Sequence, residues 1–116
     1  MEKKNLRIVF MGTPEFAVGS LQRLVENGYN VVAVVTQPDK PVGRHASVLR
    51  PSPVKEYALA HGLPVLQPLK MKDEHFLDEL RSYHADLQVV VAFRMLPEVV
   101  WAMPRFGTFN VHAALL

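Results

Sequence analysis

The chain has 116 residues, of which 49% are hydrophobic and 21% charged, and its 13 Lys and Arg against 11 Asp and Glu give a formal net charge of +2. This size and balance indicate one globular domain, exclude a disordered or repeat protein, and provide no overall field that would attract nucleic acid. Cysteine is absent, which excludes disulfides, thiolate nucleophiles and thiolate metal sites.

The first third of the chain predicts a strand, a helix and a second strand. Residues 7–11, apolar apart from Arg7, and residues 31–35 are runs of the kind found in parallel strands covered on both faces. Between them Thr13 suits a helix N-cap and Pro14 the first helical position. Such a unit is a right-handed crossover, so the fold class is α/β. A single glycine, Gly12, stands at the first turn, whereas a dinucleotide-binding fingerprint needs three.

Residues 37–53 fit neither a helix nor a strand, because prolines recur through them. Lys40, Arg44 and Arg50 outnumber Asp39 there. We predict a long, mobile, basic loop. Loops of this length inside a compact domain are usually functional or disordered, and the alternative reading is a solvated connector.

The remainder of the chain predicts three helices and three strands. In chain order they are helix 54–61, a brief edge strand at 63–68, helix 73–83, a central strand at 87–93, helix 97–103 and strand 108–112. We expect Trp101 and Met103 to pack under the sheet. Together the elements predict a Rossmann-like, doubly wound parallel sheet of about five strands in the order 3-2-1-4-5.

The last predicted strand carries the candidate catalytic residues. Asn110 and His112 are two apart, so in an extended segment they emerge on one face, with Val111 buried behind them. A carboxamide can hold a developing oxyanion and an imidazole titrates near neutrality, so the pair suits attack on a carbonyl. The alternative is a turn-forming asparagine and a surface histidine.

Apolar side chains follow the preceding strand at the same edge of the sheet. With the order 3-2-1-4-5, Phe93, Met95 and Leu96 lie beside strand 108–112 and can wall a flat heteroaromatic ring. The carboxyl edge is where open α/β sheets bind ligands. For each residue taken singly, ordinary core packing is the alternative.

Four motifs occur in one order: Gly-Thr-Pro-Glu-Phe-Ala at 12–17, Thr-Gln-Pro-Asp-Lys-Pro at 36–41 followed by Gly43-Arg44, Pro-Ser-Pro-Val-Lys at 51–55, and Asn-Val-His-Ala at 110–113. Together they resemble the methionyl-tRNA formyltransferase family. The last motif alone is shared by all folate-dependent formyltransferases, and the 36–41 motif selects the tRNA enzymes. The resemblance covers essentially the whole chain but only the N-terminal part of those enzymes.

This resemblance implies transfer of a formyl group from 10-formyltetrahydrofolate to the α-amine of methionyl initiator tRNA, with no metal ion and no covalent enzyme intermediate. It implies that Asn110 and His112 are catalytic. The folate-contacting residues that it implies are Phe93, Met95, Leu96, Ala114, Leu115 and Leu116. It further implies that loop 37–53 enters the acceptor arm of the tRNA, with Arg44 as the main contact and added charge from Lys40, Arg50 and Lys55.

The chain departs from the family pattern at three places. Arg94 stands where the family usually has a glycine, Ala114 replaces a common serine, and residues 45–47 replace a glycine and a pair of lysines. The family's third catalytic group, an aspartate about thirty residues further on, has no counterpart, nor has its C-terminal tRNA-binding domain. We therefore expect an N-terminal fragment, truncated before the end of the formyltransferase domain, with little or no activity.

Two other classes of function remain open. One is a sibling formyltransferase acting on a small amine, such as a purine precursor or a nucleotide sugar; the other is a non-catalytic Rossmann-like binding module. Apolar runs are far shorter than the roughly 18 residues of a membrane helix, and the N-terminus is charged where a secretory signal would be apolar. We expect a cytoplasmic protein that is a monomer at full length.

Overall fold

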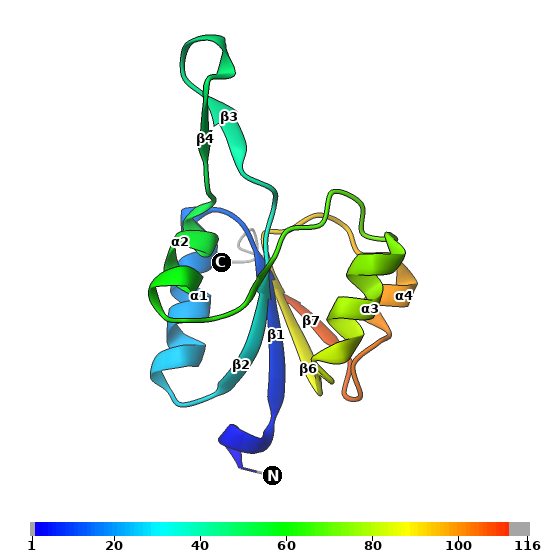
Figure 1. Ribbon diagram of the computed structural model, residues 1–116. Coiled ribbons are helices and arrows are strands. Elements are labelled where there is room, and N and C mark those ends of the chain that lie inside the picture. The colour runs from blue at the N-terminus through cyan, green and yellow to red at the C-terminus, as the bar shows by residue number, and fades with distance from the viewer. Residues whose placement is uncertain (1, 112–116) are drawn as a thin grey trace.

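The computed structural model of the chain describes residues 2–111. Its centre is a five-stranded sheet in the order β5-β2-β1-β6-β7, in which every pairing is parallel (Figure 1). The strands are β1 (Arg7–Gly12), β2 (Asn30–Val35), β5 (Val65–Leu66), β6 (Leu87–Val91) and β7 (Thr108–Val111). Counted along the chain, these strands lie in the order 3-2-1-4-5, which confirms the predicted topology and the α/β class.

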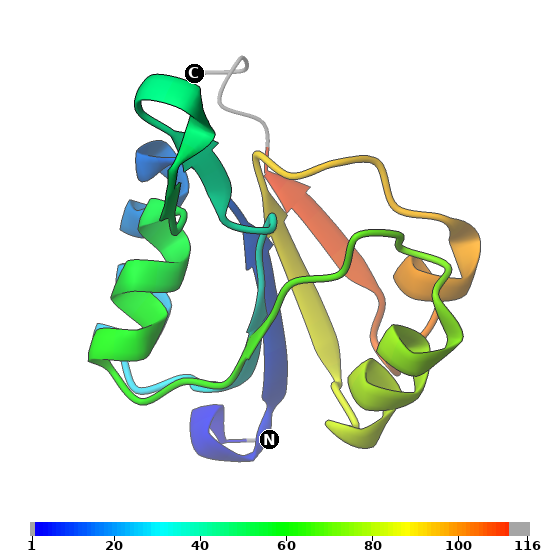
Figure 2. The same cartoon turned by 45° about the horizontal axis from the view of Figure 1, so that its top comes forward.

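Helices cover both faces of the sheet, as a doubly wound fold requires. On one side lie α1 (Glu15–Glu26) and α2 (Pro53–Ala60), and on the other α3 (Glu74–Ser82) and α4 (Glu98–Trp101), as Figure 2 shows from a second direction. A short 3₁₀ turn, η1 (Lys3–Asn5), precedes the sheet. All parallel strands end at the same edge, the carboxyl edge, at the top of Figure 1.

Polar side chains cap the N-termini of two of the helices. Ser52 Oγ accepts from the Lys55 backbone N–H at 3.0 Å before α2, and Asp73 accepts from Phe76 N–H at 2.9 Å before α3. The expected N-cap of α1 is wrong: Pro14 occupies the cap position, and the Thr13 hydroxyl accepts from the Gln37 N–H at 3.3 Å. Thr13 thus joins the turn after β1 to the segment after β2.

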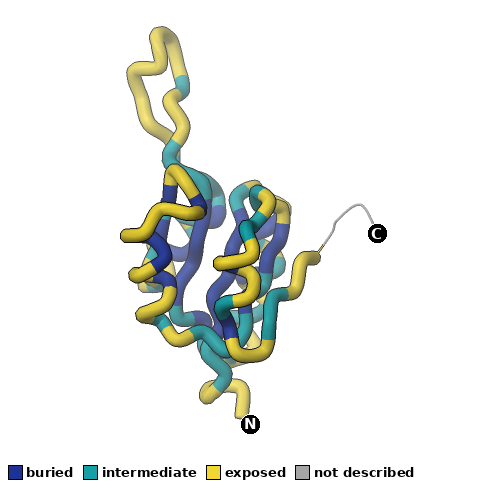
Figure 3. The backbone as a smooth tube through the Cα atoms, turned by 90° about the vertical axis from the view of Figure 1, so that its right-hand side faces the viewer, coloured by how far each residue is buried: buried dark blue, intermediate teal, exposed yellow. Residues whose placement is uncertain are grey.

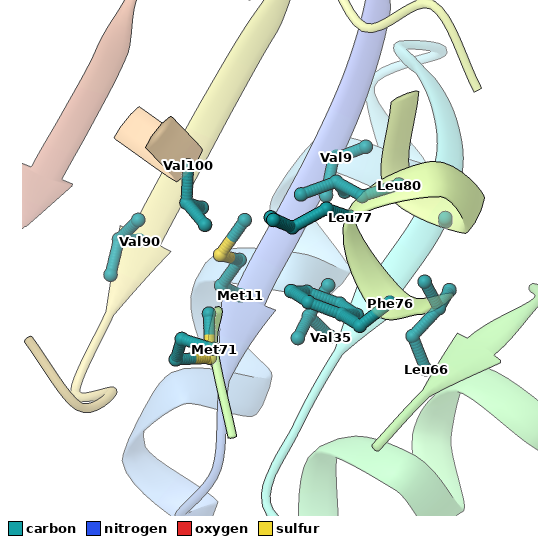
Figure 4. Close-up of a cluster of buried hydrophobic side chains, with 11 residues drawn as sticks. Val9, Met11, Val35, Leu66, Met71, Phe76, Leu77, Leu80, Val90 and Val100 are labelled. Atoms are coloured by element: carbon teal, nitrogen blue, oxygen red, sulfur yellow. The ribbon is translucent and has the colours of Figure 1, made fainter. Parts of the chain in front are cut away.

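The core consists of two clusters separated by the sheet. Alternate residues of β1 serve both: Val9 and Met11 face α3 and α4, and Phe10 faces α1 and α2. Figure 4 shows the first cluster, in which side chains of α3 and α4 meet those of β1, β2, β5 and β6. Met103 packs at the border of this cluster, as expected.

Gly12 ends β1 at a place where no side chain fits. A Cβ at this position would lie 2.7 Å from the Val91 carbonyl oxygen and 3.0 Å from the Ala17 Cβ. The glycine therefore lets β1 and β6 stay paired up to the carboxyl edge, where β6 passes into the loop that follows it.

Residues 40–50 form an antiparallel hairpin, so the predicted irregular loop is wrong. Its strands are β3 (Lys40–Val42) and β4 (Val48–Arg50), with a 3₁₀ turn, η2 (Arg44–Ala46), at the tip. The hairpin projects from the carboxyl edge, and none of residues 40–50 is buried (Figures 1 and 3). Strands of three residues carry no usable alternation, and Pro41 is tolerated because a two-stranded ribbon has open edges.

Candidate active site

A cavity of about 440 Å³ opens at the carboxyl edge between β6, β7 and α4. Its walls are formed by Val90, Phe93, Arg94, Met95, Leu96, Trp101, Thr108 and Asn110. The set contains the three apolar residues and the asparagine that the sequence singled out. The structure thus brings the predicted apolar wall and the predicted carboxamide to one site.

Asn110 reaches this cavity from an edge strand. It lies opposite Val90 in the parallel β6–β7 register, and its side chain is solvent-exposed. Thr108, two residues earlier, faces the same cavity, as alternation along a strand requires. A carboxamide that borders an open cavity can donate a hydrogen bond to a carbonyl oxygen bound there.

The loop after β6 supplies the apolar wall. Ala92 has a φ of 51°, a left-handed conformation that turns the chain sharply out of the strand. Phe93 and Leu96 then pack against the core cluster under α3 and α4, while Met95 is 92% exposed at the rim. Two of the three predicted wall residues are therefore anchored in the core, and the third faces solvent.

Arg94 lies at the rim of the cavity but turns its guanidinium towards another segment. It donates hydrogen bonds to the backbone carbonyls of Pro68 and Leu69, at 2.5 and 2.9 Å, and its Cζ lies 5.2 Å from the centre of the Phe93 ring. Partial burial lowers the pKa of the Arg94 side chain. The charge is thus used to hold protein backbone, and no acidic partner within residues 2–111 neutralises it.

Three cavity residues, Val90, Trp101 and Thr108, were not predicted to line a site. Trp101 was expected under the sheet, but it is 47% exposed and lines the cavity, because the neighbouring Val100 takes the inward position of the single-turn helix α4. The Thr108 hydroxyl oxygen lies 2.8 Å from the Trp101 carbonyl oxygen and 3.0 Å from Gln88 Oε1, and it donates its single proton to one of these two acceptors at a time. The spacing of Thr108 from Asn110 was the signal that would have found it.

The expectation that Val111 is buried is also wrong, since it is 46% exposed. Helices α1 and α2 cover β1, β2 and β6, so the corresponding face of β7 has no layer over it within residues 2–111. His112 and the predicted folate contacts Ala114, Leu115 and Leu116 lie outside the described residues. Their roles stay predictions.

The four predicted tRNA contacts divide into two groups. Lys40 and Arg50 face each other across the hairpin and Arg44 lies in its tip, all three exposed. Lys55 lies on α2, and its ammonium is held by Asp39 at 3.0 Å, with both side chains at least three-quarters buried. The hairpin therefore presents three cations to solvent, and Lys55 is engaged in fixing its base.

Residues 2–111 contain no group of three or more His, Asp or Glu side chains arranged to hold a metal ion. No helix in the same range has the length and apolar character needed to cross a bilayer.

Comparison with known proteins identifies what this arrangement belongs to. The model of the formyl transferase family matches residues 6–116. The chain is 72% identical to the methionyl-tRNA formyltransferase of Parabacteroides distasonis, 74% to that of Phocaeicola vulgatus and 60% to that of Porphyromonas gingivalis, each over all 116 residues. It spans 36% of the length of each of these relatives. The chain belongs to the formyl transferase family.

Proposed function

We propose that residues 1–116 are the N-terminal part of a methionyl-tRNA formyltransferase. The enzyme would transfer a formyl group from 10-formyltetrahydrofolate to the α-amine of methionyl initiator tRNA. The observation that carries the proposal is the cavity that Asn110 shares with Phe93, Met95 and Leu96. High identity over the whole chain to enzymes of that name supports it, and the 36% coverage supports a longer parent protein.

The cavity suits the pterin ring of the folate donor. Its space of about 440 Å³ is bounded by Phe93, Leu96 and Trp101, which offer flat or apolar surface to a heteroaromatic ring. Asn110 and Thr108 add polar groups on one wall. When bound, the donor supplies the formyl carbon and the nitrogen that leaves it.

The chemistry is attack of an amine on a carbonyl carbon. The amine nitrogen forms a bond to the formyl carbon, the bond from that carbon to the donor nitrogen breaks, and the proton lost by the amine ends on the donor nitrogen. Asn110 donates to the formyl oxygen as negative charge develops on it. We assign the movement of the proton to His112, which follows Asn110 by two residues in the same motif.

The hairpin supports a nucleic-acid substrate. Three exposed cations, Lys40, Arg44 and Arg50, project from the same edge of the sheet as the cavity. Guanidinium groups match phosphate and base edges, and lysine adds charge that does not depend on sequence. We propose that the hairpin contacts the acceptor arm of the tRNA while the methionyl amine enters the cavity. A monomeric, cytoplasmic enzyme is part of the same proposal.

The test is formylation by the full-length gene product that contains residues 1–116. With charged initiator tRNA and 10-formyltetrahydrofolate, we expect Asn110→Ala to lower kcat roughly 100-fold or more, as loss of an oxyanion donor does. The melting temperature should stay unchanged, because the side chain is exposed. Gln22→Ala, on the remote surface of α1, is the matched control and should keep full activity.

Three outcomes would contradict the proposal. Formylation of a purine precursor or a nucleotide sugar, with none of the tRNA, would assign the chain to a sibling enzyme. An unchanged rate in both Asn110→Ala and His112→Ala would leave only a binding module. Residues 1–116 assayed alone are expected to be inactive, and turnover equal to that of the full-length protein would contradict the proposal that catalysis needs the rest of a longer enzyme.

A further inference from the structure

A three-residue segment connects the hairpin to the cavity. It consists of Gln67, Pro68 and Leu69, which follow β5 and lead across the sheet towards α3 (Figure 2). We call it the 67–69 strap. Each of its ends is bonded to a residue far away in sequence, one in the hairpin base and one in the cavity wall.

The hairpin end of the strap is a cluster around one carboxylate. Gln67 Nε2 donates to Asp39 Oδ1 at 2.8 Å and to the Gln37 carbonyl at 3.1 Å. Lys55 Nζ donates to both oxygens of Asp39, at 3.0 and 3.1 Å. These hydrogen bonds hold the pKa of Asp39 below its ordinary value, with Gln67 as the leading cause. Asp39 directly precedes β3, so the cluster fixes the point from which the hairpin leaves the domain.

The cavity end of the strap is held by the guanidinium group of Arg94. Its two terminal nitrogens bond the carbonyls of Pro68 and Leu69, which are consecutive residues of the strap. Pro68 itself is buried, and its ring restricts the backbone between the two anchors. Because Arg94 also borders the cavity, the same short segment touches both candidate binding regions.

The hairpin needs such an anchor because packing does not supply one. No residue from 40 to 50 is buried, so its direction depends on polar contacts at its base. One set joins the two legs, through Thr36 and Ser52, whose hydroxyl oxygens lie 2.6 Å apart. That contact closes the hairpin but does not orient it relative to the cavity, whereas the strap extends from Asp39 to the cavity rim.

We propose that Asp39, Gln67 and Arg94 are positioning residues, and that the 67–69 strap sets the distance between the hairpin and the cavity. A substrate held by the hairpin then presents its reactive amine at a fixed place relative to Asn110. The consequence for catalysis rests on the proposed function, but the mechanical role does not. Gln67 and Arg94 act through the strap and have no part in the chemistry.

The first experiment measures position without using activity. Spin labels at Leu49→Cys on the hairpin and Val99→Cys on α4, both exposed sites, report the distance between the hairpin and the cavity side in the full-length protein. Residues 1–116 contain no cysteine, and any elsewhere in the gene product is replaced by serine. We expect one narrow distance distribution that broadens in Gln67→Glu, which places two carboxylates together, and in Arg94→Met, which removes both carbonyl contacts.

The matched control is Arg105→Met. Like Arg94, Arg105 lies beside an aromatic ring, with its Cζ 4.5 Å from the centre of the Phe106 ring, but it is exposed and does not contact the strap. It should leave the distribution unchanged. A distribution that stays narrow in Arg94→Met, or in Gln67→Glu, overturns the proposal. Because the two variants act at opposite ends of the strap, misfolding of one leaves the other to decide.

The second experiment asks whether position matters to the reaction. In Gln67→Glu we expect the KM for methionyl-tRNA to rise about tenfold while the KM for the formyl donor stays the same, since the altered contact is on the hairpin side. An unchanged KM for the tRNA would refute the catalytic consequence. A parent protein that does not formylate tRNA at all would refute the proposed function. The distances between the spin labels would still test whether the strap holds the hairpin in place.

Discussion

The cavity and the β3–β4 hairpin lie at the same edge of the sheet but are held by different forces. The cavity wall continues into the core, since Phe93 and Leu96 pack on the cluster that contains Val90 and Val100. The hairpin buries none of residues 40–50 and depends on hydrogen bonds and an ion pair at its base. Substitutions of the buried residues behind the cavity should therefore change stability, and substitutions of the exposed hairpin residues should leave it unchanged.

The largest effect on stability is expected at Gly12, where the end of β1 pairs with Val91 of β6. Gly12→Ala forces a methyl group to within 2.7 Å of the Val91 carbonyl oxygen, and relief requires the paired ends of β1 and β6 to separate. We expect a loss of about 3 kcal/mol of unfolding free energy in urea titrations, at the upper end for overpacking.

Gly19→Ala is the control for that change. Gly19 is an exposed residue inside α1, and an added methyl group there would meet no atom within 4 Å, so alanine should stabilise the helix by about 0.5–1 kcal/mol. Equal effects of the two substitutions would show that the close approach of β1 to β6 is not a constraint.

A smaller loss is expected from Thr108→Val, which keeps the shape of the side chain and removes its hydroxyl. Gln88 is fully buried, its Oε1 is bonded to Thr108, and its Nε2 has no partner among residues 2–111. The substitution removes the hydroxyl that Gln88 Oε1 and the Trp101 carbonyl share, and it leaves the buried Gln88 amide without a side-chain partner among residues 2–111, at a cost of about 2 kcal/mol in the same titration. Thr108→Ser, which retains the hydroxyl, should recover most of the loss, and failure to do so would argue against the hydrogen bond.

In the hairpin we expect a substitution to change substrate binding and not stability. Arg44→Ala should leave the free energy of unfolding within about 0.5 kcal/mol of the parent, because Arg44 is exposed at the tip. In formylation assays on the full-length protein the KM for methionyl-tRNA should rise about tenfold, with the KM for the formyl donor unchanged. Arg23→Ala removes an exposed arginine of α1 and serves as the control. A fall in stability with no change in the KM for the tRNA would show that the hairpin, like the cavity wall, contributes to the fold and not to tRNA binding.

The smallest effect is the response of the hairpin base to pH. The pKa of Asp39 is lowered from 3.8 by hydrogen bonds from Gln67 and Lys55. A lowered folded-state pKa means that the contribution is complete above the ordinary value and is lost only as pH falls through the lowered one. The distance between labels at Leu49→Cys and Val99→Cys should therefore stay constant from about pH 8 to pH 5 and broaden only below about pH 4. Broadening near pH 6 would show that another group controls the base.

The elements with long apolar runs were predicted correctly from the sequence. The apolar runs of β1, β2 and β6 and the rule of right-handed crossovers were sufficient for the strand order 3-2-1-4-5. Placement of Asn110 beside Phe93 and Leu96 followed from that order, because parallel strands share one carboxyl edge.

Short elements and long-range contacts were not predictable in the same way. The hairpin strands have three residues each, and the burial of Trp101 was misjudged because α4 has only four. The contacts of Arg94 lie 25 and 26 residues away in sequence, at backbone carbonyls that carry no sequence signal. Lys55 appeared to be one more cation for nucleic acid, and only its distance to Asp39 reveals its other role.

The way the hairpin is attached has a consequence for protein engineering. Its legs leave and re-enter the domain at Thr36 and Ser52, whose hydroxyls meet, and nothing between residues 40 and 50 contributes to the interior. A different ribbon, longer, shorter or of another charge, can therefore be grafted in place of residues 40–50, with Asp39 retained, while the folding of the rest proceeds as before. Evolution has the same freedom, so the length and charge of the hairpin can diverge without being limited by the tolerance of the core.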